Sequence, residues 1–167
     1  MNLFIKEFKS SCEELKKNNI KVVFSGRKSP LRRDVLEAMD YLRDETKDNT
    51  GGILNICLNY GGQSEIVDAT KDIIKDVLEG KISEEEITPD LFKKYLYQDL
   101  PPVDLMIRTG GDVRVSNFLL WQIAYAEMYF PNCFWPDFDA KEFDKSYGLQ
   151  ENVPKGADLV CYHSDRK

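Results

Sequence analysis

Histidine and paired cysteines are scarce in this sequence of 167 residues. With one histidine, His163, no histidine-based catalytic triad is expected. The cysteines form no Cys-x-x-Cys pair, which argues against a zinc site and favours reduced thiols; they are Cys12, Cys57, Cys133 and Cys161. No run of about 20 apolar residues could cross a membrane. The charged, amphipathic start lacks the apolar core of a signal peptide, so we predict a cytoplasmic protein without a transmembrane segment.

An excess of positive charge is also missing. The chain has 23 Lys and Arg against 29 Asp and Glu, and this net charge of -6 argues against a nucleic-acid partner. The apolar share of 42% and the charged share of 31% are ordinary for a globular protein of one domain. Any phosphate binding must therefore come from a local cluster of positive side chains.

Hydrophobic periodicity predicts helices that alternate with strands. The expected helices cover residues 2–18, 31–42, 66–77, 89–96 and 117–128, with a further turn or two at 143–147. The expected strands cover residues 21–24, 53–60, 103–107 and 133–135. This alternation predicts an α/β fold, with a mainly parallel sheet of about four strands flanked by helices and ligands at the carboxyl ends of the strands. We expect one domain over residues 1–148 and a loose tail over residues 149–167, where periodicity is lost.

The strand expected at 103–107 leads into a candidate anion site. Gly110 and Gly111 follow it, and a glycine pair before a helix lets backbone N–H groups converge on an anion. Arg108 and Arg114 flank the turn and can form paired, charge-assisted hydrogen bonds to phosphate, while Ser116 adds a hydroxyl. This set of donors suits a diphosphate. The absence of a Gly-Lys-Ser/Thr ending argues against a nucleotide P-loop.

A structural interpretation fits the same residues. The glycine pair can be a tight turn, and the arginines can be surface charges or ion-pair partners of Asp104 or Asp112. A second glycine pair, Gly61 and Gly62, ends the strand at 53–60, and with Asn59 it could line the same site or form a purely structural turn. On residue chemistry alone, both alternatives stay open.

The segment DLMIRTGGDVRVSNFLLWQIAYAEMYF, followed by FWPDF, resembles the C-terminal signature of the cis-prenyltransferases, the family of undecaprenyl diphosphate synthase. The resemblance continues through LNICLNYGGQSEIVDA and KVVFSGRKSPLRRDVLEAM, and covers residues 3–147. It implies that Arg108, Arg114 and Ser116 hold the diphosphate of isopentenyl diphosphate. It also implies that Glu127 helps organise Mg2+ and the substrate phosphates, as a catalytic residue and through a partner subunit as a metal ligand, and that residues 117–130 contribute to a homodimer interface.

The sequence departs from the family pattern at several points. An Asp-Gly-Asn-Gly-Arg-Trp type motif, whose aspartate binds Mg2+ at the allylic diphosphate, is not found, nor is a Phe-Ser-x-Glu-Asn-Trp type segment or a C-terminal Arg-x-Gly. A Glu-His pair common after the glycines is Asp112-Val113. The chain therefore resembles the half of the family's site that binds isopentenyl diphosphate, without the N-terminal strand and helix.

The resemblance implies condensation of isopentenyl diphosphate with an allylic diphosphate, with Mg2+, in a homodimer or with a partner chain. A different interpretation is a non-catalytic subunit or truncated remnant that binds a diphosphate or assists a full-length partner. An unrelated phosphate-binding module is a third. For Glu127 the alternative is an ordinary ion pair, and for residues 117–130 it is an intramolecular core helix.

Overall fold

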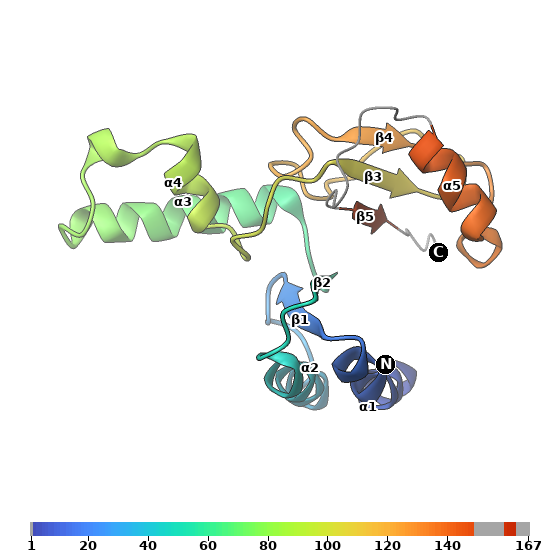
Figure 1. Cartoon of the computed structure of the whole chain (residues 1–167). Helices are drawn as coiled ribbons and strands as arrows, with labels where there is room; N and C mark the ends of the chain where they lie inside the picture. The colour runs from blue at the N-terminus through green and yellow to red at the C-terminus, as the bar shows by residue number, and fades with distance from the viewer. Residues whose placement is uncertain (1, 149–158, 163–167) are drawn as a thin grey trace. The chain divides into compact units, whose positions relative to one another are not determined.

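The structure, a computed structural model, describes residues 2–148 and 159–162. Figure 1 shows the order of its helices and strands along the chain. Contacts divide the chain into two compact units, Met1–Asp99 and Leu100–Lys167, which are described separately below. The single domain expected over residues 1–148 stays a prediction.

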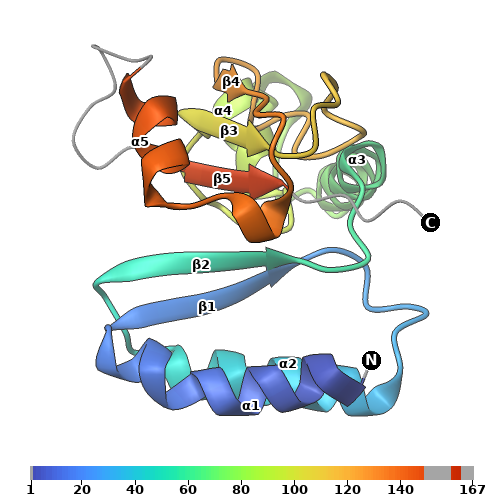
Figure 2. The same ribbon diagram turned by 90° about the vertical axis from the view of Figure 1, so that its right-hand side faces the viewer.

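The first unit is built on two parallel strands, β1 (Ile20–Ser25) and β2 (Gly52–Cys57). The helices α1 (Asn2–Lys17) and α2 (Arg33–Thr46) both lie along one face of this pair, as Figure 2 shows. Thr46 fixes the end of α2 to the sheet, because its Oγ1 donates to the Leu42 carbonyl at 2.8 Å and accepts from the backbone N of Val22 at 3.0 Å. The strands and helices expected in this region are confirmed, with small shifts at their ends.

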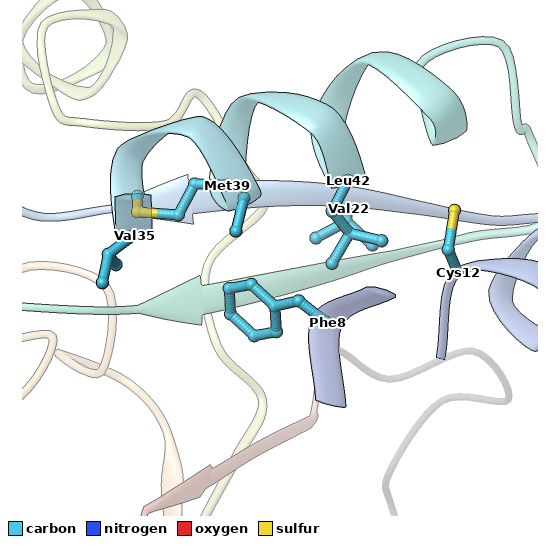
Figure 3. Packing of buried hydrophobic residues seen from close by; sticks show 7 residues of the cluster. Phe8, Cys12, Val22, Val35, Met39 and Leu42 are labelled. Atoms are coloured by element: carbon cyan, nitrogen blue, oxygen red, sulfur yellow. The ribbon is translucent and has the colours of Figure 1, made fainter. Parts of the chain in front are cut away.

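The core of the first unit lies between these two helices and the strands. Its buried side chains come from three elements, as Figure 3 shows: Phe8 and Cys12 of α1, Val22 of β1, and Val35, Ala38, Met39 and Leu42 of α2. The helical members recur at spacings of three and four residues, which places them on one face of each helix. Burying each large apolar side chain stabilises the fold by about 1.5 to 3 kcal/mol.

Three further elements complete the first unit: α3 (Gly62–Leu78), a short 3-10 helix (Glu84–Glu86) and α4 (Pro89–Lys94). A capping box is present, since the Glu86 side chain accepts from the backbone N of Ser83 at 2.7 Å and the Ser83 side chain caps the third residue in return. Among the predicted site residues, Gly62 is the one that lies in these three elements.

The second unit is organised around β3 (Leu105–Arg108), which is buried along its whole length. It has a parallel neighbour on each side, β4 (Glu127–Tyr129) and β5 (Leu159–Tyr162), in the order β4-β3-β5. The chain also forms a 3-10 turn at Trp135–Asp137 and the helix α5 (Ala140–Gly148). The parallel, helix-flanked α/β character expected from the sequence is therefore confirmed.

The helix expected over residues 117–128 is wrong. Residues 116–125 form consecutive turns, and β4 begins at Glu127. Ser116, Asn117 and Leu119 have φ angles of 46°, 62° and 44°, in the left-handed region, which a right-handed helix cannot contain. Only part of this apolar run is buried: Leu119 and Ile123 are 5% exposed, whereas Tyr125 is 97% exposed.

Two other expectations in the second unit need correction. The strand expected at residues 133–135 is absent, because Pro136 lies within a 3-10 turn and the strand of this region is β4 instead. Within the segment 149–167, expected to be a loose tail, the structure describes residues 159–162, and these pair with β3. Leu159 and Val160 lie opposite Leu105 and Met106.

Candidate functional site

Arg108 is the centre of the candidate site. It is the last residue of β3, and only 2% of its surface is exposed. Its Nη1 donates to the backbone carbonyl of Arg114 and to Ser116 Oγ, both at 2.7 Å. A buried arginine keeps its charge, so such contacts are needed to offset its loss of water. Arg108 therefore holds the loop that follows it in a defined shape.

Arg114 and Asp112 complete the cluster at the open side. The Arg114 Nη2 lies 2.5 Å from Asp112 Oδ2, and Arg108 Nη2 approaches the same oxygen at 3.4 Å. The side chains of Arg114 and Asp112 are 43% and 39% exposed. The structure brings Arg108, Arg114 and Ser116 together and confirms the ion pairing with Asp112 that the structural interpretation expects, while a shared anion site of the three residues stays a prediction. Two guanidinium groups share one carboxylate, which leaves one positive charge in excess.

Gly110 and Gly111 do not present their N–H groups to a ligand. The backbone N of Gly110 donates to the Cys133 carbonyl at 2.9 Å, and that of Gly111 donates to the Pro131 carbonyl at 3.1 Å. Both N–H groups are used in hydrogen bonds inside the chain, so the prediction that they bind an anion is wrong. The prediction that a helix begins after them and adds its N-terminal charge is also wrong. At Gly111 the φ angle is 73°, a left-handed conformation that favours glycine, and a Cβ atom there would lie 2.8 Å from Asn132 Oδ1 in the loop after β4. The glycines are a structural turn.

The backbone around Ser116 is strained. Three of the four residues from Ser116 to Leu119 have left-handed φ angles, which cost of order 1 to 2 kcal/mol each for residues with a Cβ. Such clusters of strain occur where surrounding contacts hold a functional geometry. Here the contact is the hydrogen bond from Arg108, which keeps the Ser116 hydroxyl within the arginine cluster.

Thr109 is a residue of this site that the sequence did not single out. Its side chain is buried, and within the part of the chain that the structure describes its Oγ1 has no hydrogen-bond partner. Buried hydroxyls are normally satisfied. No local sequence signal indicates this, because it depends on the packing around the end of β3.

Glu127 lies away from the arginine cluster along the sheet. It is exposed, it is the first residue of β4, and it stands opposite Leu105, three residues before Arg108. That offset corresponds to about 10 Å of strand. Its backbone N donates to the Asp104 carbonyl at 2.8 Å. Within the described residues, the Glu127 side chain contacts neither Arg108 nor Arg114 and forms no ion pair. Any catalytic or metal role in a partner's site stays a prediction.

The second glycine pair belongs to the first unit. Asn59 has a left-handed φ of 50°, and its Nδ2 donates to the carbonyls of Arg27 at 2.8 Å and Ser29 at 2.9 Å. Gly61 is the residue before α3, and its carbonyl accepts the backbone N of Glu65 at 3.0 Å. These contacts favour the structural interpretation for Asn59 and Gly61. A role of Asn59, Gly61 and Gly62 in lining a substrate site stays a prediction.

A further charged cluster in the first unit joins three segments. Arg27, two residues after β1, makes a bidentate pair with Asp68 of α3 at 2.8 and 2.7 Å, and the Tyr97 hydroxyl donates to Asp68 at 2.7 Å. These bonds, Arg27 first, lower the pKa of Asp68 to about 2. Burial and the Asp68 charge raise the pKa of Tyr97 to about 12. No local sequence signal indicates this cluster, since Asp68 lies 41 positions from Arg27 and 29 positions from Tyr97.

Glu65 is the most deeply buried carboxylate of the described residues, with 1% of its surface exposed. It accepts a hydrogen bond from the Tyr60 hydroxyl and one from the backbone N of Tyr97 at 3.1 Å. Its position in the first turn of α3 adds the favourable field of the helix N-terminus. Glu65 thus serves to attach the segment after α4 to α3.

Across residues 2–148 and 159–162, no group of three or more His, Cys, Asp or Glu side chains could hold a metal ion. The donors of the arginine cluster are positive and suit an anion. These residues therefore do not fit Mg2+ by themselves, and no step is derived through it. Cys12, Cys57 and Cys133 are free thiols, as expected.

No helix in the described part of the chain is both long and apolar enough to span a membrane.

Comparison with known proteins decides the family. Residues 1–148 match the family described as "Putative undecaprenyl diphosphate synthase". The chain belongs to the undecaprenyl diphosphate synthase family. The resemblance to cis-prenyltransferases is thus confirmed, and the arginine cluster lies within the part of the chain that carries the match.

Individual members of the family agree with this assignment. An isoprenyl transferase of Fusobacterium nucleatum is 49% identical over 154 residues, which are 90% of this chain and 64% of that protein. The Francisella tularensis ditrans,polycis-undecaprenyl-diphosphate synthase, (2E,6E)-farnesyl-diphosphate specific, is 44% identical over 96% of this chain and 64% of its own length. The chain thus spans about 64% of the length of these relatives.

A solved structure has the same fold. The lavandulyl diphosphate synthase from Lavandula x intermedia, in complex with dimethylallyl diphosphate, superposes with a TM-score of 0.84 at 29% identity. The match covers 92% of this chain and 67% of the lavender protein. The partial cis-prenyltransferase fold expected from the sequence is confirmed.

Proposed function

We propose that the arginine cluster binds the diphosphate group of isopentenyl diphosphate. The observation that carries the proposal is that Arg108, held by Ser116 and the Arg114 backbone, points its guanidinium at the same carboxylate oxygen as Arg114 does. A diphosphate offers oxygens to both guanidiniums and to the Ser116 hydroxyl, and charge-assisted bonds of this kind contribute about 1.5 to 3 kcal/mol each.

The reaction served by this binding is the family's condensation of isopentenyl diphosphate with an allylic diphosphate, which lengthens a polyprenyl diphosphate. In that reaction the allylic C–O bond breaks and the diphosphate leaves with the electron pair. The isopentenyl double bond attacks the carbon, and a proton then leaves the isopentenyl CH2 next to the diphosphate-bearing carbon, which forms the new double bond. The contribution of Arg108, Arg114 and Ser116 is to fix the isopentenyl group, which supplies proximity and orientation.

We propose that this chain alone binds the diphosphate without turning it over. Departure of the allylic diphosphate needs positive charge or a metal ion at the leaving group. The described residues offer no group of side chains that could hold a metal ion. This supports the interpretation as a non-catalytic subunit, or as a partner of a chain that carries the remainder of the site.

We further propose that the second unit associates with another chain of the family, most simply a second copy. Large apolar side chains are exposed along residues 113–135, and 77% of Val113, 97% of Tyr125 and 68% of Phe134 is accessible. Exposed apolar groups of this size mark contact surfaces in proteins. A role for the exposed carboxylate of Glu127, toward Mg2+ or substrate in a partner's site, belongs to this proposal.

Calorimetric titration with isopentenyl diphosphate tests the binding proposal. Arg114→Ala should weaken binding at least tenfold, because one charge-assisted contact is lost. The matched control is Arg33→Ala, which removes an exposed arginine of α2 paired only with Glu37 within the described residues and should leave binding unchanged. A wild-type chain that does not bind, or two variants that bind alike, would contradict the proposal.

A further inference from the structure

The carboxylate of Asp112 occupies the place where the two guanidinium groups of the cluster meet. Its Oδ2 lies 2.5 Å from Arg114 Nη2 and 3.4 Å from Arg108 Nη2. An anion that bonds these two Nη2 groups takes the position of this oxygen, since each guanidinium directs that donor at it. We propose that Asp112 is a built-in competitor for the anion site, which a diphosphate has to displace before it binds; this inference rests on the proposed function.

The three charged groups differ in their freedom to move. Arg108 is fixed, because it is 2% exposed and its Nη1 is bonded to Ser116 Oγ and the Arg114 carbonyl. The side chains of Asp112 and Arg114 are 39% and 43% exposed. The partly exposed Asp112 carboxylate can therefore move toward water more readily than Arg108, whose guanidinium stays in place to receive an oxygen of the ligand.

The balance of forces favours exchange of the carboxylate for a diphosphate. An exposed ion pair between single charges contributes little. A diphosphate has two anionic groups and can form short hydrogen bonds to both guanidinium groups at once. The single Asp112 oxygen makes one short contact, at 2.5 Å to Arg114, and one long contact, at 3.4 Å to Arg108. Until exchange occurs, Asp112 reduces the fraction of molecules that can bind, and the apparent affinity falls by that fraction.

Titration with sodium pyrophosphate tests this inference on the full chain. Asp112→Asn keeps the shape of the side chain and its acceptor oxygen but removes the charge, and should tighten pyrophosphate binding about tenfold or more, as expected when a like charge close to an anion is removed. Glu37→Gln, which takes the same charge from an exposed pair with Arg33 on α2, should bind as the wild type does. Asp112→Ser repeats the test with a smaller neutral side chain, and thermal unfolding checks that each variant is folded.

The outcomes separate this inference from the proposed function. Tighter binding by Asp112→Asn or Asp112→Ser, with Glu37→Gln unchanged, supports the competitor role, also if the wild type binds too weakly to measure. If the wild type binds pyrophosphate and both Asp112 variants bind equally or more weakly, Asp112 positions the arginines, and the inference is overturned while the proposed function stands. If no folded variant binds, both are overturned.

Discussion

The Tyr97 hydroxyl and the Arg27 Nε meet at one oxygen of Asp68, at 2.7 and 2.8 Å. This carboxylate connects the end of β1, the helix α3 and the segment after α4. Because Asp68 must be ionised to accept these bonds, its contribution to the stability of the first unit depends on pH.

Asp68→Asn should lower the free energy of unfolding at pH 7 by about 1 kcal/mol. This is the usual contribution of a charge-assisted hydrogen bond, reduced because the pair is partly exposed to solvent. The folded-state pKa of Asp68, about 2, lies below the ordinary value of about 3.9. The stabilisation is therefore complete above about pH 4 and is lost as pH falls toward 2. Urea unfolding at a series of pH values should show that the free energy of unfolding falls less between about pH 4 and pH 2 in Asp68→Asn than in the wild type. Asp44→Asn, at an exposed pair with Arg43, is the control; equal acid slopes for Asp68→Asn and wild type would refute the prediction.

Gly26→Ala should destabilise the first unit strongly. Gly26 has a φ of 126°, and a Cβ there would lie 2.1 Å from the Leu58 carbonyl oxygen, a backbone atom that cannot rotate away. We expect a loss of about 3 kcal/mol or more in the free energy of unfolding. Gly80→Ala is the matched control, because Gly80 also has a positive φ, 69°, but has open space around it. It should lose only about 1 kcal/mol. Equal losses measured by chemical denaturation would show that close approach at Gly26 is unimportant.

The purified chain should form little or no polyprenyl product from farnesyl diphosphate, isopentenyl diphosphate and Mg2+. Loss of one group that stabilises developing charge lowers a rate by about 100-fold to 1,000-fold, and the described residues have no metal-holding group at all. Product is measured by chromatography, with the Fusobacterium nucleatum isoprenyl transferase as the positive control. Turnover comparable to that of this relative would overturn the proposal of binding without catalysis.

Tyr125→Ser should weaken self-association of the chain by about tenfold or more. Tyr125 is 97% exposed, and aromatic side chains of this kind often dominate the energy of an interface. Analytical ultracentrifugation over a range of concentrations measures the change. Tyr41→Ser, on α2 of the first unit and 43% exposed, is the control. A wild-type chain that stays monomeric at all concentrations would contradict the proposed contact.

The sequence predicted best those features that depend on residues near each other in the chain. The helices α1 and α2 were found because their apolar side chains recur within one turn, as with Phe8 and Cys12. The contact between Arg108 and Ser116 is local as well, since eight positions separate the two residues.

The errors arose where the structure depends on distant segments. The apolar residues after Asn117 predict a helix, but an apolar run specifies neither the left-handed φ angles at Asn117 and Leu119 nor the exposure of Tyr125. The N–H groups of Gly110 and Gly111 were expected to be free, but their acceptors, Cys133 and Pro131, lie about 20 positions later and reach them only after β4 has formed. Periodicity carries no information on such partners.

The parallel strand pairings also set an order in which the chain can fold. Leu105 aligns with Glu127, 22 positions later, and with Leu159, 54 positions later. Closing the longer loop costs more chain entropy and is slower. The pairing of β3 with β4 should therefore come first, and it brings the carbonyls of Pro131 and Cys133 to the glycine turn. During synthesis, the arginine cluster can thus take its final shape while β5 is still being made.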